Sequence, residues 1–188
     1  LVGSEMCIRD RPIYNEDKTM VITFNGEIYN HLELREDLIS KGHVFTTHAD
    51  TEVLLHGYEE YGAELLKKVR GMFAFVIFDK KTNTVFGARD RFGVKPFYYF
   101  LNDEQLIFSS EIPPILEVYG QKNKPNELAI YEYLLHNRTD QTENTFFEGI
   151  KKLQHGHCFE IKNNQLTINR WYNVADRIKQ CNADPKKY

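Results

Sequence analysis

The sequence FNGEIYN, at residues 24–30, places an amide, a glycine and a carboxylate directly after an apolar segment. That segment, TMVITF at residues 19–24, is rich in β-branched and aromatic side chains and predicts a strand. The dipeptide of Asn25 and Gly26 favours positive φ angles, so we expect the chain to turn sharply there. The polar groups would then form a site at the end of a core strand.

These residue types suit acyl-transfer chemistry. The Asn25 amide and the Gly26 N–H are the kind of donors that form an oxyanion hole for a tetrahedral intermediate. Glu27 is suited to accept hydrogen bonds from a cationic amine. The same dipeptide is also typical of an ordinary turn between a strand and a helix, and the local sequence leaves that alternative open.

The composition excludes several function classes. The 188 residues carry a formal net charge of −3, which gives no electrostatic reason to expect nucleic acid or an anionic membrane as a partner. The longest apolar run, residues 72–78, is too short to cross a bilayer. Three scattered cysteines favour a reducing compartment, so we expect a cytoplasmic protein. No two of the seven histidines share a helical metal-site spacing with a carboxylate beside them, so we expect no metal.

Further along the chain, the hydrophobic pattern predicts helices, then strands, then helices again. Expected helices span residues 30–42, 50–61, 63–69, 113–119 and 127–136; expected strands span 71–79, 84–90, 95–100 and 106–110, and a hairpin joins 158–161 to 166–172. Asn30 and Glu33 resemble a capping box, and Asp50 is a candidate helix cap. We expect the four strands to form one antiparallel meander, covered on both faces because residues 71–79 are apolar on both sides.

Three further features are interpreted as structural. Arg89, Asp90 and Arg91 follow a predicted strand, where such charges are more typical of a solvated turn than of a phosphate site. The aromatic residues 97–100 are expected in the core, because no basic groove accompanies them. Cys158 lies within a predicted strand and should be an inert buried thiol.

Several motifs occur together in the order of a known family. The chain from residue 12 to 172 resembles the class II glutamine amidotransferase domain of asparagine synthetases, a type of N-terminal-nucleophile hydrolase. The matching motifs are PIYN at 12–15, NGEIYN at 25–30, DTE at 50–52, GMFAF at 71–75, RDRFGVKP at 89–96 and SEI at 110–112. The resemblance implies an α+β fold in which two sheets lie between helical layers, a four-layer αββα sandwich.

The resemblance also implies a substrate and a set of site residues. It assigns Asn25 and Gly26 to an oxyanion hole for L-glutamine, and Glu27 and Asp50 to the α-amino group of that substrate. In the parent enzymes the released ammonia serves the ATP-dependent amidation of aspartate. We therefore expect no cofactor in residues 12–172, with ATP and Mg²⁺ bound by a C-terminal synthetase domain. A homodimer of the parent enzyme is compatible with the resemblance.

The chain departs from the family pattern at its start. The family begins with Met-Cys, whose cysteine is the nucleophile, followed by a strand, a helix and an RGPD segment with a substrate-binding arginine. Here Met6 and Cys7 are separated from the predicted oxyanion loop by residues 8–24 alone. We therefore expect Cys7 not to be the nucleophile and the fold to lack its first strand and helix. Residues 1–11 resemble a translated sequencing adapter, and we expect them not to be native protein.

At the other end, residues 173–188 are polar and are expected to begin a linker towards the synthetase domain, whose SGGxDS loop does not occur in this sequence. Two alternatives to an inactive part of an asparagine synthetase remain. One is a standalone pseudo-amidotransferase that binds an amino acid or a partner without catalysis. The other is the amidotransferase domain of a different amide-forming synthetase.

Overall fold

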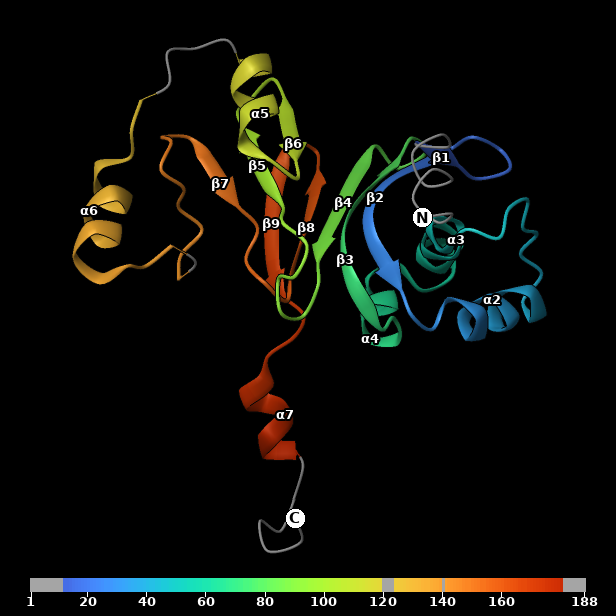
Figure 1. Ribbon diagram of the computed structural model, residues 1–188. Coiled ribbons are helices and arrows are strands. Elements are labelled where there is room, and N and C mark those ends of the chain that lie inside the picture. Colours follow the sequence, from blue (N-terminus) through green and yellow to red (C-terminus); the bar gives the residue numbers. More distant parts are fainter. Residues whose placement is uncertain (1–11, 120–123, 140, 181–188) are drawn as a thin grey trace, which may run out of the picture.

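The computed structural model describes residues 12–119, 124–139 and 141–180, which form two antiparallel sheets with helices on their outer sides (Figure 1). The larger sheet has the order β1-β2-β3-β4-β8-β9, and the smaller has the order β6-β5-β7. The strands are β1 (Ile13–Tyr14), β2 (Met20–Ile28), β3 (Gly71–Asp79), β4 (Thr84–Arg89), β5 (Tyr98–Leu101), β6 (Leu106–Ser109), β7 (Ile150–Lys152), β8 (His157–Lys162) and β9 (Gln165–Arg170).

The helices form an outer layer on each side. The first group covers the larger sheet and comprises α2 (His31–Ser40), α3 (Asp50–Tyr61), the 3₁₀ turn η1 (Gly62–Glu64) and α4 (Leu65–Lys68). On the side of the smaller sheet lie α5 (Ile112–Tyr119) and α6 (Glu127–His136). In the described ranges, every helix is too short or too polar to span a membrane.

Three hydrophobic clusters fill the three interfaces between these four layers. Strand β3 explains the first two, because its side chains alternate between opposite faces of the sheet. Phe73, Phe75 and Ile77 pack towards α2, α3 and α4. Ala74 and Val76 pack towards the smaller sheet. The third cluster joins that sheet to α5 through Phe100, Ile115 and Ile150. The expected four-layer α+β architecture is confirmed.

The predicted meander is wrong, because its four strands belong to two sheets. Strands β3 and β4 pair in the larger sheet, whereas β5 and β6 pair in the smaller one. The crossing segment between them is held by Asp90, whose carboxylate accepts hydrogen bonds from four backbone amides. They belong to Phe73, Phe92, Val94 and Lys95. Asp90 is buried, so its charge is compensated by peptide donors and not by water.

The neighbouring arginines also bind backbone groups. Arg89 donates to the carbonyls of Lys95, Leu153 and Gly93, and Arg91 donates to that of Val69. Residues 89–91 therefore have the predicted structural role, but the predicted solvated turn is wrong, because Asp90 is buried. The aromatic residues after the crossing are in the core as expected, since Phe97, Tyr99 and Phe100 are all buried.

The predicted capping box at Asn30 is absent. Asn30 is the N-cap residue of α2, but its side chain makes no capping hydrogen bond. Instead its amide donates to the Lys68 carbonyl and accepts from the Arg70 amide, which ties the start of α2 to the start of β3. Glu33 pairs with the Arg70 side chain at 2.9 Å. Hydrogen bonds to residues distant in the sequence thus take the place of the local capping bond.

The ends of the chain show one further difference. Residues 1–11 and 181–188, where the sequence predicts adapter-derived and linker segments, lie outside the described residues. The linker prediction for residues 173–188 did not anticipate α7 (Val174–Gln180), which projects from the end of β9 in Figure 1.

Candidate functional site

The turn predicted at Asn25 and Gly26 is wrong, because β2 continues through both residues to Ile28. Asn25, Gly26 and Glu27 pair with Ala74, Phe73 and Met72 of β3. Gly26 has φ +150°, and a Cβ atom there would lie 2.1 Å from the Met72 carbonyl oxygen. The glycine therefore serves close approach of two strands, and the Asn-Gly pair does not reverse the chain.

Alternation along β2 places the polar side chains on one face of the sheet. Phe24 and Ile28 pack against the helices, so Asn25 and Glu27 lie on the opposite face, towards the smaller sheet. The Asn25 amide donates a hydrogen bond of 2.9 Å to the hydroxyl of Ser110, which follows β6. This bond connects the two sheets at the predicted site.

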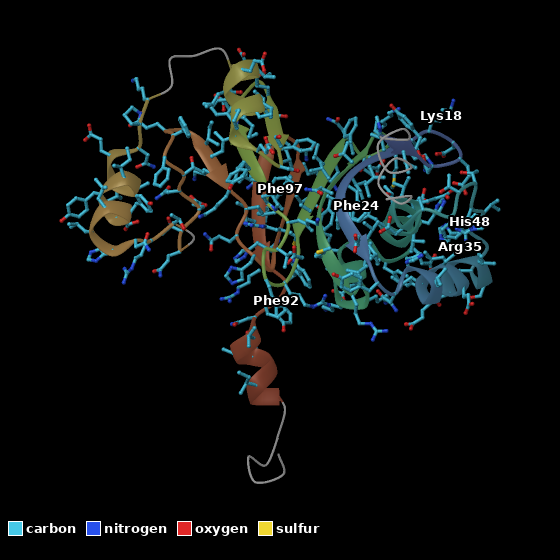
Figure 2. The ribbon with its side chains drawn as sticks, viewed as in Figure 1. Lys18, Phe24, Arg35, His48, Phe92 and Phe97 are labelled. Atoms are coloured by element: carbon cyan, nitrogen blue, oxygen red, sulfur yellow. The ribbon has the colours of Figure 1, made fainter. Side chains whose placement is uncertain are left out.

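A cavity of about 420 Å³ lies beside the bond between Asn25 and Ser110. Its walls come from both sheets, and Figure 2 labels two of its residues, Phe24 of β2 and Phe97 before β5. The lining is mainly apolar with a few polar groups, which is typical of a small-molecule site. It consists of Thr23, Phe24, Asn25, Ala74, Phe75, Val76, Pro96, Phe97, Phe108, Ser109 and Ser110.

Asp50 lies at the same end of β2 and does not cap its helix. The N-cap residue of α3 is Ala49, without a side-chain capping bond. The Asp50 carboxylate instead accepts a hydrogen bond of 3.0 Å from the backbone amide of Ile28. Because Glu27 directly precedes Ile28, the structure brings both predicted carboxylates to the end of β2. Both lie outside the lining of the cavity.

Two supporting residues were missed as site residues. Ser110 lies in the SEI motif, but only the fold shows that it meets Asn25. Glu52, in the DTE motif, is buried and accepts four hydrogen bonds from the backbone amides and hydroxyls of Thr46 and Thr47. Burial alone would raise the pKa of Glu52, but these hydrogen bonds outweigh it and lower the pKa. Glu52 thus holds the loop that leads into Asp50.

The sequence that forms this site is similar to a known protein family. A family model described as a glutamine amidotransferase domain matches residues 7–172. The chain belongs to this family. The bond between Asn25 and Ser110, the cavity and the two carboxylates therefore lie within a glutamine amidotransferase domain.

Asparagine synthetases are similar to this chain in sequence, and a solved amidotransferase is similar to it in fold. Asparagine synthetase 1 of Bacillus subtilis is 37% identical over 175 residues, which cover 93% of this chain and 27% of that protein. Asparagine synthetase 2 of Oryza sativa subsp. japonica is 49% identical over 104 residues, covering 55% of this chain and 17% of that protein. The fold resembles glutamine phosphoribosylpyrophosphate amidotransferase of B. subtilis, with a TM-score of 0.59, 19% identity, and coverage of 85% of this chain and 31% of that one. This amidotransferase domain spans about a quarter of the length of relatives such as those of B. subtilis.

Proposed function

We propose that this amidotransferase domain binds L-glutamine at the end of β2 and is the glutamine-hydrolysing part of an asparagine synthetase. The observation that carries the proposal is the hydrogen bond from Asn25 to Ser110 at the intersheet cavity, with Glu27 and Asp50 at the same strand end. Similarity to asparagine synthetases over most of the chain supports this assignment over a standalone binding module or a different synthetase.

The four residues divide into two groups that match the two ends of glutamine. The Asn25 amide and the Gly26 N–H are neutral donors, and they suit the side-chain carbonyl oxygen where negative charge develops. Glu27 and Asp50 are carboxylates, and they suit the α-ammonium group. This division orients the substrate, because exchanging its two ends would place an ammonium against donors.

The chemistry requires a cysteine of the parent enzyme, which we place outside residues 12–180. Its thiolate adds to the carbonyl carbon of the glutamine side chain, and the C–N bond then breaks as the nitrogen takes up a proton and leaves as ammonia. Water hydrolyses the thioester to glutamate and regenerates the thiol. In this proposal, the ammonia is consumed in a synthetase domain that amidates aspartate with ATP and Mg²⁺.

Calorimetric titration with L-glutamine tests the binding site. The chain should bind in a saturable manner at millimolar ligand, and Glu27→Gln and Asp50→Asn should each weaken binding at least about tenfold by removing one charged partner of the ammonium. Glu36→Gln, which changes an exposed carboxylate on α2, is the matched control and should bind as the unmodified chain does. Failure to saturate, or equal binding by all variants, would refute the site.

An ammonia-release assay tests the placement of the nucleophile. The chain should produce no ammonia above the uncatalysed rate. If it does hydrolyse glutamine and Cys7→Ser abolishes the activity, then Cys7 is the nucleophile and the proposed division between this chain and its parent is wrong.

Helix α6 is the surface that we propose to be covered in the parent enzyme. Leu128, Tyr131, Leu134 and Leu135 on this helix are each more than half exposed, and such an apolar patch is typical of an interaction surface. The relatives are about four times longer than the chain, so they contain further protein to cover it. Leu134→Ser should change the free energy of unfolding of the chain by less than about 0.5 kcal/mol, but it should lower the melting temperature of the full-length parent.

The control for this experiment is Leu32→Ser. Leu32 is also exposed but lies on α2, at the opposite side of the molecule in Figure 1, and its replacement should affect neither protein. An unchanged parent carrying Leu134→Ser would show that α6 is not covered.

A further inference from the structure

Two imidazoles and a carboxylate from separate segments meet beside α3. His56 and Glu59 lie one turn apart on that helix, and His43 lies on the loop between α2 and α3. One ligand atom from each of the three residues lies within 4.8 Å of the other two. We propose that His43, His56 and Glu59 form a binding site for a divalent transition-metal ion such as Zn²⁺.

The geometry requires only a small adjustment. In the structure, one Glu59 oxygen, Oε2, lies 2.7 Å from His56 Nδ1 and 3.8 Å from His43 Nδ1. In a tetrahedral site with metal–ligand bonds of about 2.0–2.2 Å, the ligand atoms lie roughly 3.3 Å apart. The three atoms are therefore within about 1.5 Å of that arrangement.

Neighbouring groups hold the ligands in place. The Asn15 amide donates to the other Glu59 oxygen, Oε1, at 2.6 Å, which directs Oε2 towards the imidazoles. The Phe45 ring packs against the His56 ring in a T-shaped arrangement with 4.8 Å between ring centroids. Glu52 Oε1 lies 3.8 Å from His56 Nε2. A carboxylate on the second imidazole nitrogen is the usual partner of a metal-bound histidine.

Burial and charge both suit a cation with an open coordination position. The His56 side chain is 1% exposed, whereas those of His43 and Glu59 are 18% and 20% exposed, which leaves a route for a metal ion and a water ligand. Four carboxylates each lie within 3.9 Å of an imidazole nitrogen of His43 or His56, and one of the four also forms an ion pair with Lys41. They belong to Glu16, Glu52, Glu59 and Glu60.

Glu52 is excluded as a direct ligand by its other bonds. Each of its oxygens already accepts two hydrogen bonds from Thr46 or Thr47. It therefore acts on the site through His56 and through the loop that carries His43. A metal ion bound by His43, His56 and Glu59 would join this loop directly to α3.

The sequence predicts no metal because it contains no pair of histidines at a helical spacing. The second imidazole comes from a loop residue 13 positions before His56, and only the packing of that loop on α3 brings it close. The proposed site therefore differs from the expectation drawn from spacing alone.

Titration of the metal-stripped chain with Co²⁺ and Zn²⁺ tests the proposal. The titration should use a C7S/C181S background, because free thiols bind the same metals, and a pH of about 8, because protons compete for imidazole. One equivalent of Co²⁺ should bind and give visible absorption bands of tetrahedral intensity. Zn²⁺ should displace it and raise the melting temperature, as expected for a ligand that binds the folded state.

Three variants separate this site from adventitious binding. His43→Gln and Glu59→Gln should each weaken Zn²⁺ binding at least about tenfold. His48→Gln removes an exposed imidazole of the same loop, labelled in Figure 2, and should leave the affinity unchanged. Melting curves of the metal-free variants establish that each is folded. The proposal is overturned if no saturable binding is seen, or if both ligand variants bind as tightly as His48→Gln does.

Discussion

The Asp50 carboxylate, at the start of α3, accepts a hydrogen bond of 3.0 Å from the backbone amide of Ile28, at the end of β2. This contact connects the helix layer to the strand that carries Asn25, Gly26 and Glu27. It gives Asp50 a structural role in addition to the proposed binding of the substrate ammonium. The two roles make different demands, since the first needs an acceptor oxygen and the second needs a negative charge.

Substitutions at Asp50 should therefore separate stability from binding. Asp50→Asn keeps an acceptor for the Ile28 amide, so the free energy of unfolding should change by less than about 1 kcal/mol while glutamine binding is weakened. Asp50→Ala removes the acceptor and should cost about 1–3 kcal/mol. Urea unfolding of both variants checks this. Equal destabilisation by both would show that the stabilisation by Asp50 does not come from its acceptor oxygen.

Gly26 should tolerate no side chain. The Cβ atom of Gly26→Ala would lie 2.1 Å from the Met72 carbonyl oxygen, so β2 and β3 would have to separate. We expect a loss of at least about 3 kcal/mol in the free energy of unfolding. Gly42→Ala is the matched control, because Gly42 also has a positive φ, +99°, but nothing lies within 4 Å of its Cβ position. It should cost roughly 1 kcal/mol from the backbone alone.

Glu52 should be needed for the loop that precedes Asp50. In Glu52→Gln one buried oxygen acceptor becomes an NH₂ donor that faces the N–H and hydroxyl of Thr46 or Thr47, so these donors lose their partner. The expected cost is about 1–3 kcal/mol, measured by urea unfolding. Glu36→Gln, at an exposed position, should cost nothing measurable. An unchanged free energy of unfolding in Glu52→Gln would mean that these hydrogen bonds to the loop do not contribute to the stability of the fold.

Cys158 should be unreactive at neutral pH. It is buried, and burial raises the pKa of its thiol, so the reactive thiolate is scarce until the pH exceeds this raised value. In a C7S/C181S chain, Ellman's reagent should modify the folded protein at least about tenfold more slowly than the protein in guanidinium chloride. Raising the pH should increase the rate for the folded protein. Rapid modification of the folded chain at neutral pH would contradict the predicted inert thiol.

Elements that depend on local patterns were predicted well. Strand β3 and helix α6 have the predicted bounds, residues 71–79 and 127–136, because their apolar periodicity is uninterrupted. The hairpin of β8 and β9 was also predicted, and Asn163 and Asn164 at its turn have the positive φ angles that asparagine tolerates.

Predictions failed where a residue had a distant partner that the local pattern does not show. Asn25 and Gly26 were expected to turn, Asn30 to cap α2 and Asp50 to cap α3. In each case, the groups involved bond to residues at least 22 positions away, such as Ser110, Arg70 or Ile28. Local propensities of this kind amount to about 1 kcal/mol, which strand pairing and buried hydrogen bonds exceed.

The sequence by itself determined the class of fold, the family resemblance and the residue types of the proposed glutamine site, since these follow from periodicity and from the order of short motifs. Only the tertiary structure decided which partners those residues have. It joined Asn25 to Ser110 across two sheets, Asp50 to the end of β2, and His43 to His56 and Glu59. The physical reason is that hydrogen bonds and metal ligands act over a few ångströms in space, whereas sequence patterns report mainly on neighbours within one element.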